Sequence, residues 1–205
     1  PDEDLAGELY EMAMERLADA GYAQYEVSNW AKGGASGVRY WRLGHPAQSY
    51  TPYPIPNACS HNLLYWRNQE YIGVGPGAHS HMRLPFEHPT ASPSPQAVGL
   101  RWSNRKPVPG YIKRMERGEP VIDFWEEIDS RTAMGESMML GLRLVEEGVS
   151  RSAFQQRHGT ALDDIFAEEL ARLAGQGLLI SDDHRVRLTR RGLMLGNQVF
   201  AAFLP

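Results

Sequence analysis

The stretch that decides how this chain is read runs from Ala58 to Met82, ACSHNLLYWRNQEYIGVGPGAHSHM. It contains the single cysteine of the 205-residue chain, three of its seven histidines, a tyrosine–tryptophan pair and a glycine-rich turn. Imidazole and thiolate groups bind metals, flat aromatic side chains accept flat ligands, and glycines let a ligand or another backbone approach closely. The combination predicts a ligand site in this stretch rather than an ordinary core segment.

His61 is the first candidate ligand, because Tyr65 and Trp66 follow it closely in HNLLYW. Iron in a porphyrin accepts an axial imidazole, and the macrocycle packs against apolar and aromatic surface. Asn62 is placed to hold a polar edge group or to orient the imidazole. From these residues alone, a structural histidine bonded to a backbone carbonyl is the commoner alternative.

Gly73, Gly75 and Gly77 alternate through YIGVGPGAH, which together with the preceding LLYWRNQE predicts a strand. One face of the strand end then carries no side chains, which favours either ligand contact or tight packing at a barrel rim. The stretch has neither the phosphate-loop ending nor the dinucleotide-binding spacing. His79 and His81 would share a face if the strand continued, but a metal site there needs a further ligand.

The length and composition of the chain limit the kinds of protein that it can be. With 42% hydrophobic and 22% charged residues, 205 residues suit a globular protein of one large or two small domains. A net charge of −4 argues against nucleic acid as the main partner. One cysteine excludes an internal disulfide, which predicts a cytoplasmic location, and no apolar run is long enough to span a membrane.

The residues before the central stretch predict half of an α/β unit. Apolar spacing predicts an amphipathic helix at residues 2–20, which leads directly into the strand YAQYEVSNW. Glu26 and Ser28 would lie on one face of that strand, either toward a ligand or as a buried hydrogen-bonded pair. Abundant glycine and proline predict long loops at 33–57 and 84–109, and GYIKRMERG then predicts a short helix.

After a predicted linker around EPVIDFWEEID, the pattern changes to helices joined by short turns. Ser130 is expected to cap the first of three helices, a hairpin turns at Asp182 and Asp183, and RRGLMLGNQVFAAFL predicts a last helix. Helices followed by a two-stranded wing predict a winged-helix-like domain. From Arg131 onward nine arginines face nine acidic residues, so the basic face needed for duplex binding is missing. A winged-helix interaction module remains an alternative from another functional class.

HNLLYW resembles the His-Asn-x-x-Tyr-Trp motif associated with heme binding in HemW-type heme chaperones, relatives of oxygen-independent coproporphyrinogen III oxidase in the radical S-adenosylmethionine superfamily. YEVSNWAK before it, and YIGVGPGAHS, RWSN, ESMMLGLRLVEEGVS and VRLTRRG after it, resemble the family in the same order. The resemblance covers nearly the whole chain. It implies a C-terminal fragment: the closing part of a partial, TIM-like radical-SAM barrel at 1–125, then a mostly helical, winged-helix-like domain at 130–205.

The resemblance also implies a function and a set of site residues. His61 becomes the expected heme-iron ligand, with Asn62, Tyr65 and Trp66 completing the motif. The other residues expected near heme, some at the mouth of the barrel, are Glu26, Gly75, Gly77 and His79. The implied activity is to hold heme and pass it to acceptor hemoproteins such as respiratory-chain proteins. The alternative is a fragment of a coproporphyrinogen III oxidase, acting in porphyrin biosynthesis.

The chain departs from the family pattern in two places. The Cys-x-x-x-Cys-x-x-Cys motif for the [4Fe-4S] cluster lies upstream in full-length members and is absent here, so only the parent is expected to use S-adenosylmethionine. This chain alone is expected to be catalytically inactive. The loop at 33–57 is longer than expected, leads into Cys59-Ser60 where an arginine usually follows, and adds His45 as a competing ligand. Cys59 itself is expected to be an inert thiol, because its neighbours carry no positive charge.

Overall fold

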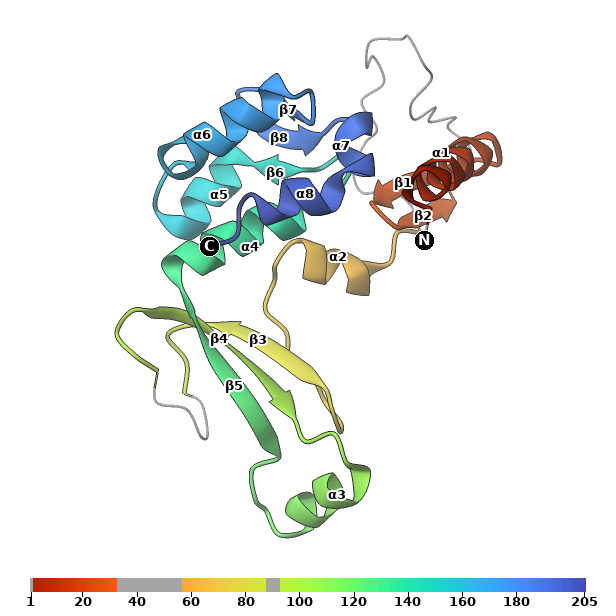
Figure 1. Ribbon diagram of the computed structural model, residues 1–205. Coiled ribbons are helices and arrows are strands. Elements are labelled where there is room, and N and C mark those ends of the chain that lie inside the picture. Colours follow the sequence, from red (N-terminus) through yellow and green to blue (C-terminus); the bar gives the residue numbers. More distant parts are fainter. Residues whose placement is uncertain (1, 33–56, 88–92) are drawn as a thin grey trace. The chain divides into compact units, whose positions relative to one another are not determined.

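The computed structural model describes residues 2–32, 57–87 and 93–205, and Figure 1 labels its elements. The chain is mixed α/β, as predicted, and the described strands form three sheets in which every pairing is antiparallel. Within the described ranges, no helix is both long enough and apolar enough to cross a membrane. The predicted loop at 33–57 lies outside the described part except for its last residue, as does His45.

The chain divides into two compact units, and the first is built from two segments that are distant in sequence. The first unit comprises Pro1–Trp66 and Met138–Phe203, and the second comprises Arg67–Ser137 and Leu204–Pro205. The domains expected at 1–125 and 130–205 follow the order of the sequence, whereas these units do not.

The first unit begins with helix α1 (Glu3–Asp19), as the helical spacing predicts. Asp2 starts this helix, because its Oδ1 accepts a hydrogen bond from the backbone N–H of Leu5 at 3.1 Å. Gly21 follows the helix with φ at +82°, in the left-handed region that glycine adopts readily. The chain therefore passes from helix to strand within a few residues.

Strands β1 (Tyr22–Glu26) and β2 (Asn29–Lys32) form an antiparallel hairpin. The single strand predicted over YAQYEVSNW is therefore wrong, and Glu26 and Ser28 do not share a strand face. The chain turns where the Glu26 carboxylate accepts hydrogen bonds from the backbone N–H of Ser28 at 2.7 Å and the Asn29 side chain at 2.6 Å. Local bonds from a side chain to the backbone compete with strand pairing, and here they favour a turn.

Helix α2 (Ser60–Trp66) occupies the stretch HNLLYW, so the strand predicted there is wrong. Its Leu63 enters a core cluster of the first unit that also contains Ala23, Tyr25, Ala31 and Leu144. In a helix, residues four positions apart lie on the same face, so His61 and Tyr65 become neighbours away from this core contact. A helix of seven residues is too short for its period to show in the sequence.

The second unit contains a three-stranded antiparallel sheet in the order β3-β4-β5. Its strands are β3 (His79–Arg83), β4 (Ala97–Asn104) and β5 (Ile122–Asp129). Helix α3 (Val108–Glu116) connects β4 to β5, as GYIKRMERG predicts. Strand β4 corrects the loop predicted at 84–109, and β5 corrects the linker predicted around EPVIDFWEEID. Both strands bury apolar side chains, including Leu100 and Ile128, through pairing that no local pattern reveals.

The remaining elements are helices and the strands of a small sheet in the order β6-β8-β7. They are α4 (Ser130–Gly141), β6 (Val149–Ser150), α5 (Arg151–His158), α6 (Leu162–Gly175), β7 (Leu179–Ser181), β8 (Arg185–Leu188), α7 (Arg190–Met194) and α8 (Gly196–Ala201). The predicted hairpin is confirmed as β7 and β8, with Asp182 accepting two backbone N–H bonds at the turn. The single last helix is wrong, because α7 and α8 are separate helices that meet at Leu195. Helix α4 starts at Ser130, but Asp129 accepts the N–H of Thr132 at 2.7 Å in place of the predicted Ser130 cap.

Thr189 joins the end of one helix to the start of another. Its Oγ1 accepts the N–H of Gly192 at 2.9 Å in α7 and donates to the carbonyl of Gly177 at 2.7 Å after α6. We expect Thr189→Ala to lower the free energy of unfolding by about 1–2 kcal/mol, because both bonds are lost. Urea denaturation measures the change, and Thr189→Ser, which keeps the hydroxyl, is the control. Equal stability of the alanine and serine variants would contradict the assigned cap.

Candidate functional site

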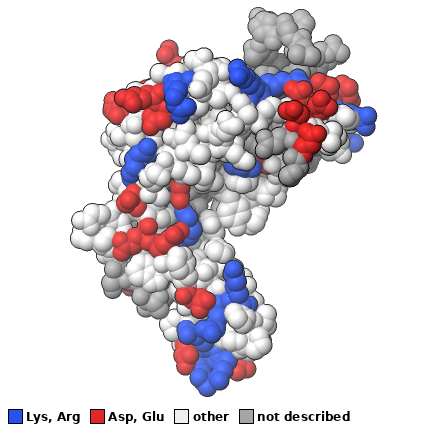
Figure 2. Space-filling view, viewed as in Figure 1, with Lys and Arg blue, Asp and Glu red and all other residues white. Residues whose placement is uncertain are grey.

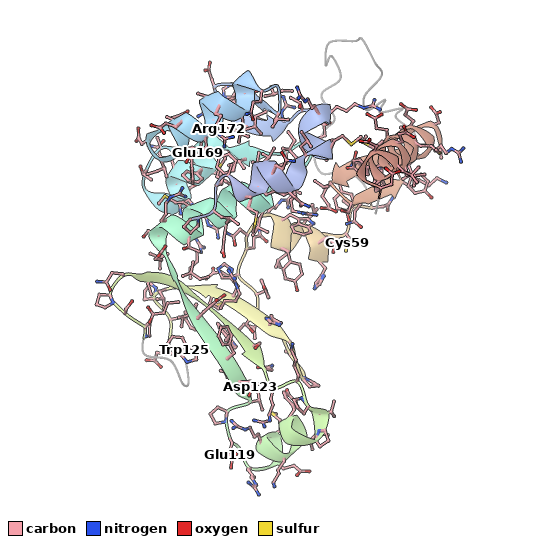
Figure 3. All side chains as sticks on the ribbon, in the orientation of Figure 1. Cys59, Glu119, Asp123, Trp125, Glu169 and Arg172 are labelled. Carbon is pink, nitrogen blue, oxygen red and sulfur yellow. The ribbon has the colours of Figure 1, made fainter. Side chains whose placement is uncertain are left out.

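The His61 side chain is exposed and lies in the first turn of α2, two residues after Cys59. Figure 3 labels Cys59 beside this helix. The Tyr65 hydroxyl lies 3.2 Å from His61 Nε2, and the two rings meet edge to face with centroids 4.8 Å apart. This contact follows from the helical spacing of four residues. The imidazole is therefore exposed at the surface. It is not bonded to a backbone carbonyl of the described residues, as a purely structural histidine would be.

Asn62 connects α2 to the neighbouring hairpin. Its Nδ2 donates to the hydroxyl of Tyr25 at 3.3 Å, and the Tyr25 side chain is buried in the core of the first unit. Together with the buried Leu63, this bond fixes the inner side of the helix. Asn62 thus holds the helix in place rather than facing outward beside His61.

Trp66, the last residue of α2, packs against the guanidinium group of Arg143. The guanidinium carbon of Arg143 lies 4.2 Å from the centroid of the Trp66 ring, within the range of a cation–π contact. The indole Nε1 is buried and has no hydrogen-bond partner among the described residues. A buried donor without an acceptor is costly, so this N–H is a group that a ligand acceptor would satisfy.

Glu26 is completely buried beneath this contact. Besides the bonds from Ser28 and Asn29, its Oε2 accepts from Arg143 Nη2 at 3.3 Å. A buried carboxylate requires such partners, because an unpaired charge in the interior is strongly unfavourable. Glu26 therefore has partners within the fold, and its expected contact with heme stays a prediction.

A second hydrogen-bonded group supports the same turn. The Tyr10 hydroxyl donates to the carbonyl of Val27 at 2.6 Å and accepts from Gln24 Nε2 at 2.7 Å. Burial raises the pKa of Tyr10, although the hydrogen bond from Gln24 acts in the opposite direction. The hydroxyl consequently stays a neutral donor, and it ties α1 to the turn that carries Glu26.

The glycine stretch lies in the second unit and forms turns rather than the predicted strand with a bare face. A Cβ on Gly73 would lie 2.1 Å from the carbonyl oxygen of His79, so the chain itself makes the close approach there. Gly75 and Gly77 have φ at +106° and +70°. Asn104 Nδ2 donates to the carbonyls of Gly73 and Gly75 at 3.3 and 3.0 Å. Contact of Gly75 and Gly77 with a ligand stays a prediction.

His79 and His81 both lie on β3, as predicted, with His79 exposed and His81 buried. His81 Nδ1 lies 3.4 Å from the carbonyl oxygen of Gln69, and its ring lies beside Tyr71. Within the described ranges, no group of three histidine, cysteine or acidic side chains is placed to hold a metal ion. His79 remains an expected contact near heme.

An open groove of about 450 Å³ borders the glycine stretch within the second unit. Its apolar lining includes Ile72, Val74, Trp102, Tyr111 and Met115. Basic side chains gather over α3 next to it, where the last turn of the helix carries Lys113 and Arg114 (Figure 2). The groove was not predicted, because it forms only when segments distant in sequence pack together, and one of them, β4, was read as a loop.

The residues of α2 fit the binding of heme. They supply one exposed imidazole, whose Nδ1 has no hydrogen bond within the described ranges, and a tyrosine beside it. They also include a buried indole N–H that has no acceptor among the described residues. An imidazole next to aromatic surface is one of the donor sets that hold heme.

Arg143 was not predicted as part of the site. It is the only charged residue in the otherwise apolar or glycine run MMLGLRLV, and that isolation is the signal that marks it. An arginine within a buried apolar run needs a partner, since charged side chains are rarely buried unpaired. The sequence does not reveal that the partner is Glu26, which is 117 positions away.

Comparisons with known proteins agree with the expected resemblance. Residues 128–195 match the family model of the HemN C-terminal domain. The whole chain is 34% identical to heme chaperone HemW of Bacillus subtilis (strain 168) and covers 44% of that protein. It is 29% identical to heme chaperone HemW of Lactococcus lactis subsp. lactis (strain IL1403), with 43% of that protein covered.

A solved structure shows the same fold. It is that of Escherichia coli HemN, a coproporphyrinogen III oxidase described as a radical SAM enzyme, with a TM-score of 0.57 at 15% identity. The match covers 94% of this chain and 39% of that one. At this identity the likeness shows the fold alone. The resemblance predicted from the sequence is confirmed: the chain is similar over its whole length to HemW heme chaperones, matches the HemN C-terminal domain at residues 128–195, and spans less than half the length of these curated relatives.

Proposed function

We propose that this chain binds heme through α2 and, as part of a longer HemW-type protein, passes it to acceptor hemoproteins. The observation that carries the proposal is the exposed His61 beside the half-buried Tyr65, on a helix whose other side is fixed to the core. The names of the relatives, heme chaperones of two bacteria, point in the same direction. Respiratory-chain proteins are the acceptors that we expect.

His61 would hold the iron through one ring nitrogen. Since the Tyr65 hydroxyl lies beside Nε2, ligation through Nδ1 requires that Nε2 carry the proton and that this N–H donate a hydrogen bond to the Tyr65 oxygen. A ligating histidine usually has an outer partner of this kind, which fixes the tautomer and raises the basicity of the ligand. Asn62 holds the helix, and Trp66 offers its indole N–H. When bound, heme supplies the iron that His61 ligates.

Other parts of the proposal concern the longer protein. We place Glu26, Gly75, Gly77 and His79 as further residues near heme, in a partial barrel at 1–125 that precedes a winged-helix-like domain at 130–205. The [4Fe-4S] cluster and S-adenosylmethionine would belong to the remainder of the parent, because this chain contains one cysteine. We expect the parent to act in the cytoplasm.

Titration of hemin into the wild-type chain tests the proposal. We expect a saturable change in the Soret band at one heme per chain, followed by transfer to an apo-hemoprotein such as apomyoglobin. Transfer is scored by the Soret spectrum of the acceptor after the two proteins are separated. A change that grows without saturation would show only nonspecific partition of heme, and it would contradict the proposal.

A further inference from the structure

The Arg143 side chain contacts three parts of the first unit. Its guanidinium carbon is 4.2 Å from the Trp66 ring centroid and 5.5 Å from that of Phe200 in α8. Its Nη2 is 3.3 Å from the carboxylate of Glu26, whose side chain is completely buried, while the Arg143 side chain is 21% exposed. One cation therefore joins the end of α2, the turn after β1 and α8.

The backbone around Arg143 is held as firmly as its side chain. Its carbonyl accepts the N–H of Val27 at 3.0 Å, and the N–H of Val145 donates to the carbonyl of Tyr25 at 3.3 Å. Leu144, between these two bonds, is buried in the core cluster. The backbone at Arg143 is thus fixed beside β1, and the Arg143 side chain extends from there to Trp66.

The chemistry of the contact is specific to a guanidinium. Its planar group stacks on aromatic faces and also donates in its own plane, so one group can face Trp66 and bond Glu26 together. An ammonium is a compact, strongly hydrated charge that does not reproduce this geometry. The buried Glu26 carboxylate needs a cationic partner, and Arg143 supplies it. This pairing restricts where the guanidinium group can lie.

We propose that Arg143 is a positioning residue of the heme site, which holds the indole of Trp66 and through it the orientation of α2. The inference rests on the proposed function of α2. Arg143 lies within the HemN C-terminal domain at 128–195, whereas the motif lies outside it. The C-terminal domain therefore contributes to heme binding through one side chain that we do not expect to touch heme.

The test compares two conservative substitutions in the whole chain. Arg143→Lys is expected to weaken heme binding about 10–100-fold, the usual effect of removing an outer partner, and to leave the bound Soret position unchanged because His61 remains. Arg151→Lys is the matched control. Arg151 also pairs with an acidic residue, Asp163, and its side chain is 19% exposed. Within the described part of the chain, it makes no contact with α2. Arg151→Lys is expected to keep wild-type affinity.

Two further readouts separate positioning from general stability. Near-UV circular dichroism is measured on the heme-free chain, and the difference between the wild type and Trp66→Leu gives the contribution of Trp66. We expect Arg143→Lys to lose this contribution. In the Trp66→Leu background, Arg143→Lys should weaken heme binding little further. If Arg143→Lys folds poorly, the double variant Glu26→Gln/Arg143→Met removes both charges and leaves no buried charge unpaired, so the same readouts apply.

The outcomes are distinct. Wild-type affinity and an unchanged Trp66 signal in Arg143→Lys, with saturable binding by the wild type, would overturn the positioning role alone. Additive losses in the Trp66→Leu background would overturn it as well. Absence of saturable heme binding by the wild-type chain would overturn the proposed function and this inference together.

Discussion

Replacing His61 by alanine is expected to remove saturable heme binding, with a loss of affinity greater than about 100-fold. Removal of an outer partner of a metal ligand typically costs 10–100-fold, so removal of the ligand itself should cost more. The substitution leaves the fold intact, since the side chain is exposed and its partner Tyr65 lies on the same helix. Soret titration measures the affinity, and the spectral shift typical of an imidazole ligand should disappear.

Three comparisons make this result specific. Ser60→Ala changes an exposed neighbour at the start of α2 and should keep wild-type affinity. Tyr65→Phe keeps the ring but removes the oxygen near Nε2, and should give an intermediate loss of about 10–100-fold. Added imidazole should restore the ligand spectrum of His61→Ala. If His61→Ala and the wild type bind heme equally, His61 is not the ligand.

Replacing Phe166 by alanine is expected to lower the free energy of unfolding by about 3–5 kcal/mol. Phe166 has no exposed surface, and its ring lies edge-on to Phe203 and Phe154 at centroid distances of 5.3 and 6.2 Å. Truncation removes the buried ring and leaves a cavity that the surrounding helices fill only in part. Such a loss is a large share of the stability of a typical domain.

Urea denaturation followed by far-UV circular dichroism measures this loss. Phe124→Ala is the matched control, because the Phe124 side chain is 55% exposed, and it should change the stability by less than about 0.5 kcal/mol. Similar midpoints for the two variants would contradict the burial of Phe166.

Elements with local signals could be predicted from the sequence. Helix α1 carries its start signal in Asp2, and the β7–β8 hairpin carries its turn signal in Asp182. The strands β4 and β5 could not be recognised, because their stability comes from cross-strand pairs such as Trp102 with Trp125, which lie far apart in sequence. Helix α2 was read as a strand because a short apolar run does not distinguish the two periods.

The same division applies to the site. His61 and Tyr65 are four positions apart, so their proximity follows from helix geometry once the helix is known. The contacts of Arg143 with Glu26 and Trp66 depend on tertiary folding, which brings distant segments together. Glu26 was recognised as a polar residue with a role, but the hairpin turn that surrounds it with donors could not be foreseen.

The construction of the first unit from two distant segments has a consequence for synthesis on the ribosome. Helix α2 has seven residues, too few to persist in water without the side chains that cover it. Val145, which completes the covering segment, is made about 80 residues after Trp66. At translation rates of roughly 5–20 residues per second, that delay lasts several seconds. During this interval α2 lacks the side chains that cover it, so, if the proposed function holds, we expect heme uptake only after the segment through Val145 has been made.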